Sequence, residues 1–520
     1  MEVKKVILAI AVLGFLIGCK NKTKEPSSVK ENSELSYYQE PYRPQFHFTP
    51  EKMWMNDPNG LVYHKGLYHL FYQYYPEDTV WGPMHWGHAV SKDMMHWEHR
   101  PIALFPDEHG LIFSGSAVVD VNNTSGFGSP ENPALVAIFT YHLMEGEEAG
   151  RKDFQTQGIA YSLDNGDTWT KYTGNPVIEN TGIRDFRDPK VFWNDKANKW
   201  TMLLVAGDHL QIWESPNLID WQYTSEFGRQ QGAHGGVWEC PDLFPLEVEG
   251  TTEKKWVLLI SINPGAPNGG SGTQYFIGDF DGSTFTSDQQ EARWIDLGRD
   301  NYAGVTYNNV PNEDRIFIGW MSNWDYARDT PTEKWRSAMT LPRKLSLRKV
   351  GSGYGLFNFP LEGFDGLVEK APLQKVAVRS MDVLSVPNEN LNQSDLMFKT
   401  GAASFQLIFT NDLKEKLVVV VDRKNKMLIL NRANSGRTGF HKSFPDPIQK
   451  MPLSDLPSGK INFRIIMDWS SLELFVNDGQ HVMTTQLFPT SPYNNLVIKN
   501  MEENELQLED FQLSKVKSIW

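Results

Sequence analysis

The sequence predicts an all-β fold, a five-bladed β-propeller followed by a C-terminal antiparallel β-sandwich. From Pro41 to about residue 345, short strand-like runs are broken by Gly, Asn, Asp and Pro, with almost no sustained helical periodicity. From Val376 to Trp520, runs of alternating polarity are separated by turns about every 8 to 15 residues, a pattern typical of a sandwich. The length of 520 residues with 40% hydrophobic content allows two or three domains.

The N-terminal segment predicts export. Two lysines precede an apolar run at 6–17 that is too short to span a membrane as a mature helix, and Gly18 then precedes Cys19. The stretch LIGC at 16–19 resembles the bacterial lipobox, in which cleavage occurs before a cysteine that receives lipid. A buried helix with a chance cysteine is the alternative, and the polar stretch at 20–40 disfavours it.

We therefore expect a lipoprotein signal peptide at 1–18, lipidation of Cys19 and a flexible tether at 19–40. The protein would be lipid-anchored in a bacterial cell envelope, on its periplasmic or surface face. Cys240 is the second of only two cysteines, so the mature chain would hold no intramolecular disulfide.

A weak internal repeat predicts the propeller, which we place at 41–347. The segments AVSKDMMHW (89–97), AYSLDNGDTW (160–169) and WESPNLIDW (213–221) each place a tryptophan six or seven residues after a serine, and FIGDFDGSTF (276–285) is a degenerate fourth copy. Each copy indicates a hairpin, and two further strand candidates lie upstream of it. Four strands repeating at roughly 50 to 75 residues predict propeller blades, and 302–347 supplies the fifth.

The Gly-rich segment at 351–355 marks a change of pattern. We expect a linker at 348–372 and the sandwich domain at 373–520. The alternation in this part of the chain excludes a separate helical domain.

The composition limits the class of partner. A formal charge of −14 disfavours nucleic acid and anionic membrane surfaces as ligands, because phosphate binding requires clustered cations. Most of the 17 Trp, 18 Tyr and 29 Phe residues are expected in the core, although aromatic faces also pack against the apolar faces of sugar rings.

Each predicted blade opens with a polar break. WMNDPNG (54–60) is on its own a turn pattern, since Asx side chains bond their own backbone and proline fixes φ. Comparable breaks follow at blade spacing: FSGS (113–116), RDP (187–189), WECPD (238–242) and DNYAG (300–304). Because the innermost strands of a propeller line its channel, we expect Asp57, Gly115, Asp188, Glu239 and Asp300 to converge at one mouth of it.

Two kinds of chemistry fit such a cluster of carboxylates. A divalent-metal site would draw on an Asp-rich loop with calcium-hand spacing, and the sequence has none. Glycoside cleavage requires one carboxylate as nucleophile and one carboxylic acid as proton donor. We therefore expect glycoside chemistry with no metal and no cofactor.

The same motifs carry a family resemblance. With FHFTP (46–50), FYQYYP (71–76), WGHAVSKD (86–93), GWMSNWDYA (319–327) and WRSAMTLPR (335–343), the breaks at the blade starts resemble glycoside hydrolase family 32. That family contains the invertases, inulinases and levanases and is built as a five-bladed propeller plus a sandwich. The resemblance is dense over about 44–345.

The resemblance implies roles for the three carboxylates. Asp57 would be the nucleophile, with a low pKa and stabilising amides from the turn at 58–60. Glu239 would be the acid/base, with a pKa raised by the charges of Asp57 and Asp188. Asp188 would bind sugar hydroxyls and stabilise the transition state. Retention of configuration requires Asp57 and Glu239 about 5 to 5.5 Å apart, and an inverting pair ~6.5 to 9.5 Å.

The resemblance also implies residues that bind the fructosyl unit. Hydrogen bonds would come from Asn56, Gln73, Ser114 and Arg187, and the pocket walls from Trp54, Trp81, Phe113 and Trp324. For the four aromatic residues, simple blade packing is the alternative.

Three other features are not assigned to the site. His85, His88, His96 and His99 crowd one hairpin but lack a ligating helix face, so we expect packing instead of metal binding. Strand alternation predicts that the Cys240 thiol points away from the pocket. The segment at 264–272 is expected to be a long loop near the rim and not a phosphate loop, since no helix follows it.

The expected function is a retaining, exo-acting β-fructofuranosidase acting on fructans (inulin, levan), sucrose or both. A fructosyltransferase with the same three carboxylates, a non-catalytic fructan-binding lipoprotein and a five-bladed pentosidase are the alternatives. The three carboxylates disfavour the second, and WMNDPNG and WECPD disfavour the third. The preferred linkage is left open.

Overall fold

The computed structural model describes residues 37–446 and 448–520. The predicted signal peptide, Cys19 and most of the predicted tether lie outside the described residues. No helix within them is both long and apolar enough to cross a membrane.

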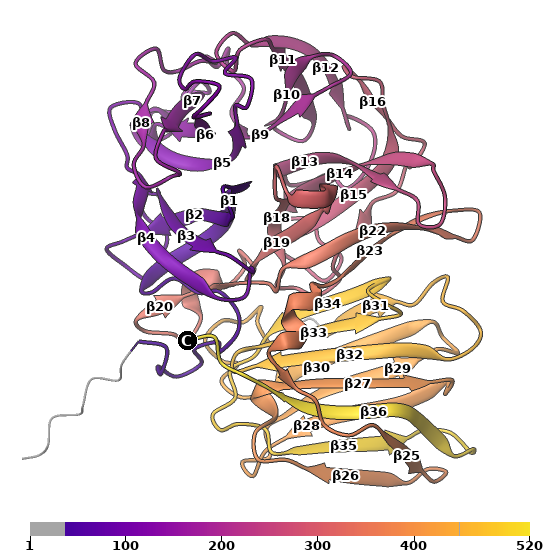
Figure 1. The fold of residues 1–520 in the computed structure, drawn as a ribbon. Helices are drawn as coiled ribbons and strands as arrows, with labels where there is room; N and C mark the ends of the chain where they lie inside the picture. The colour runs from indigo at the N-terminus through magenta and orange to yellow at the C-terminus, as the bar shows by residue number, and fades with distance from the viewer. Residues whose placement is uncertain (1–36, 447) are drawn as a thin grey trace, which may run out of the picture. The chain divides into compact units, whose positions relative to one another are not determined.

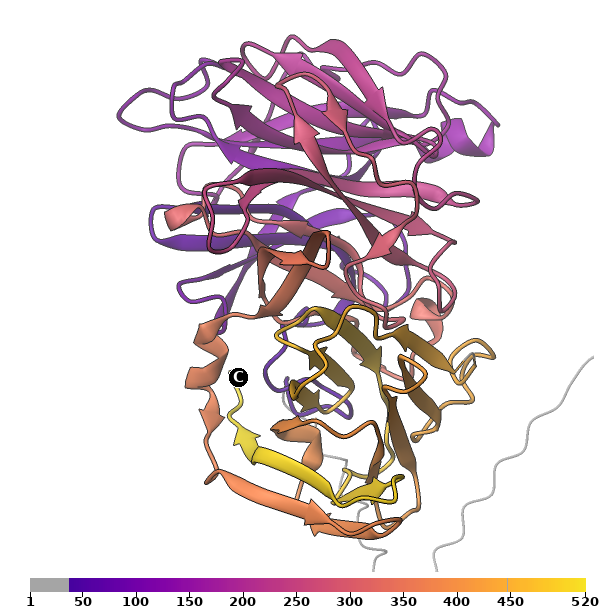
Figure 2. The same cartoon turned by 90° about the vertical axis from the view of Figure 1, so that its right-hand side faces the viewer.

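The sheets confirm the all-β prediction. Among the described residues, the one α-helix is α1 (Met144–Glu148), and 3₁₀ turns no longer than it occur at Pro311–Glu313, Ala327–Asp329, Glu362–Gly366 and Leu391–Gln393. Five sheets of four or five strands are followed by two larger ones (Figure 1). The strands of the two larger sheets are orange to yellow in Figure 2, and those of the five smaller sheets are purple to salmon.

The first three blades follow the sequence order of their strands. Blade one contains β1 (Met53–His64), β2 (Leu67–Tyr75), β3 (His85–Ser91) and β4 (Trp97–Leu104), with the late strand β20 (Trp335–Arg336) paired in parallel to β1. Blade two contains β5 (Leu111–Val119), β6 (Leu135–His142), β7 (Gln155–Ser162) and β8 (Thr170–Lys171). Blade three contains β9 (Phe186–Asn194), β10 (Lys199–Ala206), β11 (Leu210–Ser215) and β12 (Gln222–Phe227).

Blades four and five are less regular. Blade four contains β13 (Val237–Glu247), β14 (Lys254–Asn263), β15 (Gly272–Phe280), β16 (Phe285–Thr286) and β17 (Arg293–Trp294). Blade five contains β18 (Tyr302–Thr306), β19 (Ile316–Met321), β21 (Ala338–Met339), β22 (Arg343–Val350) and β23 (Gly353–Pro360). The innermost strands β1, β5, β9, β13 and β18 surround one centre in Figure 1.

The predicted end of the propeller at residue 347 needs correction. β22 continues to Val350 and pairs over its whole length with β23, which lies inside the predicted linker at 348–372. The Gly-rich segment at 351–355 indicated a break, but it forms the tight turn and the start of the return strand, with Gly351 at φ +57°.

The serine-to-tryptophan repeat corresponds to one structural unit, the turn between the third and fourth strands of a blade. The serine ends the third strand, and its Oγ accepts a backbone N–H of the turn: from Met94 to Ser91 (2.8 Å), from Gly166 to Ser162 (2.9 Å) and from Asn217 to Ser215 (3.1 Å). The tryptophan opens or precedes the fourth strand, so the repeat was a correct indicator of blades.

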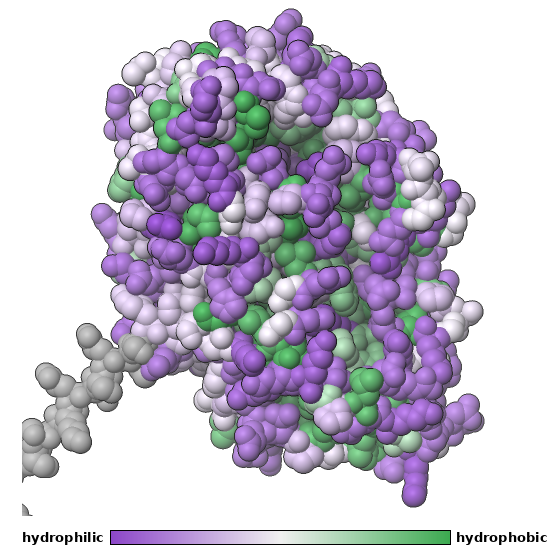
Figure 3. Space-filling model, viewed as in Figure 1, coloured by the Kyte–Doolittle hydropathy of each residue, from purple (hydrophilic) through white to green (hydrophobic). Residues whose placement is uncertain are grey.

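The C-terminal strands form two antiparallel sheets. One contains β24 (Val368–Glu369), β25 (Gln374–Val378), β27 (Ser394–Thr400), β32 (Ile461–Asp468), β33 (Ser471–Val476), β34 (His481–Gln486) and β36 (Leu506–Val516). The other contains β26 (Val383–Pro387), β28 (Ser404–Thr410), β29 (Lys416–Asp422), β30 (Met427–Asn434), β31 (Gln449–Pro452) and β35 (Asn495–Asn500). Alternate residues such as Phe405, Leu407 and Phe409 are buried in one hydrophobic cluster shared by both sheets. On the face drawn in Figure 3, hydrophilic residues predominate and hydrophobic ones form scattered patches.

A buried charge cluster joins the propeller to the sandwich. Arg343 of β22 donates to Glu473 of β33 (3.0 Å) and to Asp296 (3.0 Å), and His47 bonds both Asp468 (2.8 Å) and Glu473 (3.2 Å). All four of the ion-paired side chains Arg343, Glu473, His47 and Asp468 are fully buried. Because a buried charge without its partner is strongly destabilising, each domain holds the other's charges in place.

Asp300 also belongs to this interface. Its carboxylate accepts from Arg432 (2.6 Å) and from the Tyr326 hydroxyl (2.8 Å) and is fully buried. The expectation that Asp300 joins the channel mouth is therefore wrong. Tyr302, two residues later, takes the inward position.

The His47 cluster predicts a pH-dependent stability. Burial lowers the pKa of His47, but the hydrogen bonds and charges of Asp468 and Glu473 outweigh it and raise that pKa to about 9. This stabilisation, on the order of 3 kcal/mol, is therefore complete below pH ~6.5 and is lost as the pH rises through 9. Thermal unfolding between pH 6 and 10 should show that decline, and His47→Gln should flatten it. An equal decline in both proteins would contradict the assignment.

Candidate active site

A β-bulge interrupts the innermost strand of every blade at its functional residue. The pairing register shifts between Met55 and Pro58 in β1, Ile112 and Gly115 in β5, Arg187 and Lys190 in β9, Glu239 and Asp242 in β13, and Tyr302 and Val305 in β18. A bulge places two residues opposite one and redirects side chains locally. The breaks in the sequence are therefore bulges within strands, and WMNDPNG is not a surface turn.

Proline and a left-handed residue recur in these bulges. Pro189 and Pro241 lie within the bulges of β9 and β13, and Pro58 directly follows that of β1, in keeping with the confinement of strand prolines, which lack a backbone N–H, to bulges and edges. Asp188 (φ +64°), Cys240 (φ +46°) and Ala303 (φ +53°) adopt the left-handed region, which is uncommon for residues other than glycine. Strained backbone at equivalent positions of three blades indicates a functional site.

The bulge in β13 overturns the prediction for Cys240. Its thiol lies 3.6 Å from Asp57 Oδ2 and 3.7 Å from Asp188 Oδ2, and its backbone N–H donates to Asp188 Oδ2 (3.0 Å). Simple alternation would have turned the side chain away, but the bulge between Glu239 and Asp242 breaks that alternation. Cys240 therefore contacts two of the three carboxylates.

Asp57 is held by side-chain donors. Asn56 Nδ2 donates to its Oδ1 (3.1 Å) and Ser114 Oγ to its Oδ2 (2.8 Å). Burial raises the pKa of Asp57, and the bonds from Asn56, Ser114 and Cys240 lower it only in part. The expected low pKa is therefore wrong, because the loss of hydration outweighs these bonds.

Glu239 is bound from two neighbouring blades. Arg187 of β9 donates to its Oε1 (3.0 Å), and the Tyr302 hydroxyl of β18 donates to its Oε2. Arg187 also pairs with Asp185 (2.7 Å) and lies 3.9 Å from Asp188. The Arg187 guanidinium thus lies within ion-pair distance of three carboxylates, those of Asp185, Asp188 and Glu239.

The pKa of Glu239 is raised to about 8, and burial is the largest cause. Arg187 lowers the pKa of Glu239, whereas the charges of Asp188 and Asp57 raise it. The direction predicted from the sequence is correct, but desolvation contributes more than the neighbouring charges. Burial likewise raises the pKa of Asp188, to about 6, against the effect of Arg187. At neutral pH, Glu239 therefore carries a proton that it can donate.

These groups line a cavity of about 390 Å³. The three carboxylates meet in it, as do seven of the eight residues predicted to bind a sugar: Asn56, Gln73, Trp81, Phe113, Ser114, Arg187 and Trp324. Trp54 does not line it. Trp54 is fully buried, and its indole N–H donates to Asn56 Oδ1 (2.7 Å), so it fixes Asn56 from behind the wall.

Several lining residues were missed in the sequence analysis. They are His142, Glu147, Gln155, Asp185, Asn263 and Arg328. Arg328 lies over the rings of Trp81 (6.0 Å) and Trp324 (5.7 Å), and Glu147 joins His142 (3.1 Å) to Arg184 (2.9 Å). His142, Gln155 and Asn263 lie at strand ends, Asp185 directly precedes β9, Glu147 lies in α1 and Arg328 in the 3₁₀ turn at Ala327–Asp329, and no motif marks the inward direction at these places. Only Asp185 had a usable indication, since it lies two residues before Arg187.

The loop at 264–272 is directed to the sandwich. Asn268 donates to Lys450 O (2.9 Å) and accepts from Lys450 N (2.9 Å), and Lys450 belongs to β31. The expected place at the rim is therefore not observed for Asn268, although Asn263, just before the loop, does line the cavity.

The predicted packing role of the histidine hairpin holds for three of its four histidines. His88 stacks with Phe71, His99 packs on Phe48 and His85 packs on Phe105. His96 is exposed instead and bonds Asp93 (2.8 Å). Within 37–446 and 448–520, no group of three or more His, Cys, Asp and Glu side chains is arranged to hold a metal ion.

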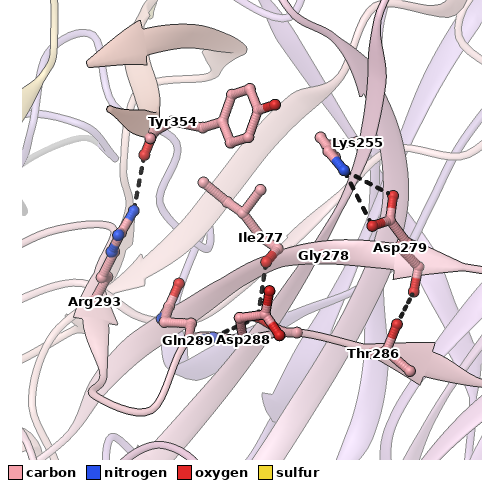
Figure 4. A pocket seen from close by; sticks show the side chains of 11 residues that line it. Lys255, Ile277, Gly278, Asp279, Thr286, Asp288, Gln289, Arg293 and Tyr354 are labelled. Atoms are coloured by element: carbon pink, nitrogen blue, oxygen red, sulfur yellow. Dashed lines mark hydrogen bonds and ion pairs between the residues drawn. The ribbon is translucent and has the colours of Figure 1, made fainter. Parts of the chain in front are cut away.

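A second cavity of about 390 Å³ lies on blade four and offers a comparison (Figure 4). Three of its charged side chains have partners of their own: Lys255 bonds Asp279 (3.0 Å), and Arg293 donates to Tyr354 O (2.8 Å). Its lining holds two carboxyl groups, Asp279 and Asp288, and the Asp279 carboxylate is already paired with Lys255. The cavity of Asp57, Asp188 and Glu239 is therefore the candidate active site.

Comparison with known proteins gives concordant matches. The family model of the glycosyl hydrolases family 32 N-terminal domain matches residues 47–360, and that of the family's C-terminal domain matches 368–515. The levanase of Bacillus subtilis is 46% identical, over 94% of this chain and 72% of its own length. The extracellular exo-inulinase of Aspergillus awamori is 42% identical, over 87% of this chain and 91% of its own length.

Solved structures match over almost the whole chain. The exo-inulinase from Aspergillus awamori has a TM-score of 0.84 at 38% identity, covering 93% of this chain and all of that one. The fructofuranosidase from Schwanniomyces occidentalis, complexed with fructose, has a TM-score of 0.82 at 34% identity, covering 94% and 100%.

The site predicts an abnormal titration for one carboxyl group. Glu239 should lose its proton near pH 8, because burial raises its pKa. Carboxyl ¹³C NMR of protein labelled at glutamate side chains should show one resonance titrating there. Glu239→Gln removes that resonance and assigns it, and a Glu239 signal that titrates near its ordinary value of 4.5 would contradict the burial argument.

Proposed function

The chain belongs to glycosyl hydrolase family 32, and we propose that it is a retaining, exo-acting β-fructofuranosidase. It would hydrolyse terminal non-reducing β-D-fructosyl units of fructans, sucrose or both. The observation that supports this most strongly is the cavity in which Asp57, Asp188 and a protonated Glu239 meet. A nucleophile and a proton donor in one cavity are what a retaining glycosidase needs.

Asp57 would act as the nucleophile. Its carboxylate attacks the anomeric carbon of the fructosyl unit while Glu239 transfers its proton to the leaving glycosidic oxygen, so that a fructosyl ester on Asp57 and a free alcohol result. Asn56 and Ser114 hold the two carboxylate oxygens in different directions. Those bonds fix the carboxylate for attack from one side of the ring.

Glu239 would then change roles. Having lost its proton, its carboxylate takes a proton from a water molecule, which attacks the anomeric carbon and releases fructose, and Asp57 and Glu239 regain their starting states. Arg187 and Tyr302 both contact Glu239 and stabilise its ionised form between the two steps.

Asp188 and Arg187 would bind the hydroxyl groups of the same sugar. The backbone N–H and thiol of Cys240 both contact Asp188 Oδ2, so that carboxylate is oriented before substrate arrives. A fixed charge at this point stabilises the positive charge that develops on the ring in the transition state.

The charge of the cavity favours a neutral sugar. Its lining includes five carboxyl groups and two guanidinium groups: Asp57, Glu147, Asp185, Asp188 and Glu239 against Arg187 and Arg328. Phosphate recognition requires an excess of cationic donors. Unphosphorylated fructans and sucrose are therefore the substrates proposed.

The proposed reaction predicts the first products. Protein beginning after Cys19, incubated with inulin, levan and sucrose, should release monomeric fructose from the earliest samples, as resolved by chromatography. A ladder of oligomers would instead indicate internal cleavage, and fructose moving to other sugars at high sucrose would indicate a transferase. Absence of any product would leave a binding protein.

Matched variants test the roles within this reaction. Asp57→Ala and Glu239→Ala should each lose at least about 10³-fold in kcat, because each removes a reacting group, while the unfolding midpoint stays near that of the wild type. With azide, Glu239→Ala should form β-fructosyl azide, since retention passes through the ester on Asp57. An α product would indicate inversion and refute the role of Asp57.

We infer the location from the N-terminal sequence. The relatives named extracellular exo-inulinase act outside the cell, and the LIGC stretch at 16–19 supports lipid attachment at Cys19. A fructan is too large to enter a cell readily, so an anchored enzyme outside the cytoplasm would meet its substrate.

Expression of the full chain in a bacterium tests the anchor. The protein should partition into the detergent phase of Triton X-114, and its N-terminal peptide should carry diacylglycerol by mass spectrometry. Cys19→Ser should move it to the aqueous phase without changing kcat on sucrose. Detergent partition of the serine variant would contradict lipidation at Cys19.

A further inference from the structure

A ring of buried polar residues lies one step below the catalytic groups. We call it the collar, and it contains one residue from each innermost strand: Asn59, Ser116, Lys190, Asp242 and Thr306. Each is at most 4% exposed. The first four lie two residues after Asp57, Ser114, Asp188 and Cys240, so the collar follows the bulges around the channel.

The charged part of the collar joins three blades. Lys190 Nζ of β9 lies 3.2 Å from Asp242 Oδ2 of β13 and donates to Thr306 O of β18 (2.5 Å). Asp242 Oδ2 also accepts from Thr306 N (2.6 Å) and Thr306 Oγ1 (2.7 Å). Five atoms are thus fixed relative to one another by directional bonds.

The same three strands carry the contacts of the acid/base. Arg187 of β9, Glu239 of β13 and Tyr302 of β18 are bonded to one another through the Glu239 carboxylate. β9, β13 and β18 belong to different sheets, so no ladder of backbone bonds sets their spacing. The strands β9, β13 and β18 are therefore connected twice. Arg187, Glu239 and Tyr302 connect them in the active site, and Lys190, Asp242 and Thr306 connect them again in the collar.

We propose that Lys190, Asp242 and Thr306 are positioning residues for Glu239 and Asp188. This rests on the proposed function, because it assigns Glu239 the proton transfer. A buried ion pair adds little stability over a well-packed apolar pair, but its geometry selects one arrangement of the strands. The collar thereby holds the distances from Arg187 and Asp188 to Glu239 and limits the water beside Asp188 on the side away from the cavity.

A small cavity supports the positioning role. A space of about 10 Å³ is lined by Ser114, Asp188 and Cys240 and also by the collar residues Asn59, Ser116 and Lys190. The space between Asp188 and the collar can therefore hold at most one water molecule. Loosening the collar would admit water beside Asp188 and let the strand that carries Glu239 shift, and a better hydrated Glu239 carboxyl group would have a lower pKa.

The test compares a neutral isosteric pair with the wild type. Lys190→Met/Asp242→Asn removes both charges together and so leaves no unpaired buried ion. We expect kcat on sucrose to fall about tenfold or more with KM within about threefold, since small displacements of reacting groups are costly. The basic limb of the pH profile should move to lower pH.

Controls separate positioning from general stability. Arg464→Met/Asp395→Asn removes an equally buried pair inside the sandwich (2.8 Å) and should leave kcat and the pH profile unchanged at a similar loss of melting temperature. Thr306→Val is a milder second variant that keeps the backbone N–H to Asp242. It should show a smaller fall in kcat in the same direction, and it decides the question if the double variant does not fold.

The proposal is overturned if folded collar variants keep the wild-type kcat and the wild-type basic limb. It is also overturned if the sandwich control changes both to the same extent as the collar variants. The NMR titration of Glu239 requires no turnover, so it tests the collar even if the wild type releases no fructose. A lower pKa of Glu239 in the collar variants would then support the collar while the proposed function is rejected, and an unchanged pKa would reject both.

Discussion

The site depends on a bulge at the same level of every innermost strand. A regular strand would alternate its side chains between the two faces of the sheet. The neighbours Asn56 and Asp57, and likewise Glu239 and Cys240, could then not both face the same site. The extra residue in each bulge removes this limit, and the prolines that follow Asp57, Asp188 and Cys240 suit it because they need no ladder bond. Backbone strain at Asp188 and Cys240 accompanies this geometry, and it is held by the blades around it.

Burial and one guanidinium then give three chemically similar groups different states. All three carboxyl groups have raised pKa values because hydration is lost. Asp57 accepts from the neutral side chains of Asn56 and Ser114. Glu239 accepts from Arg187 and Tyr302, but burial and the charges of Asp188 and Asp57 raise its pKa to about 8. The neighbours of each group thus set its role, as expected for a pair in which one carboxyl group must stay protonated.

The sequence predicted the architecture well because its indicators are local. Serine turns, strand alternation and polar breaks each arise from contacts within a few residues, so blades and sandwich strands could be counted in order. It failed where tertiary packing decides: Trp54 points behind the wall, Asp300 pairs with Arg432 of the sandwich, and Cys240 turns inward. His142, Glu147 and Arg328 line the cavity from a strand end and two short helical turns in the connections between strands, and no periodicity encodes their direction.

The sandwich also affects the position of the site through the seam, the pairing of β20 with β1 that closes the propeller. β20 of the last segment pairs with β1, the strand that carries Asp57, and the stretch from β20 to β22 leads to Arg343. Arg343 is fixed by Glu473 of the sandwich and by Asp296, and Leu341 N donates to the same Glu473 (2.9 Å). A shift of the sandwich would therefore move the seam beside β1. The sandwich thus stabilises the blade geometry on which the position of Asp57 depends, whether or not it binds glycan itself.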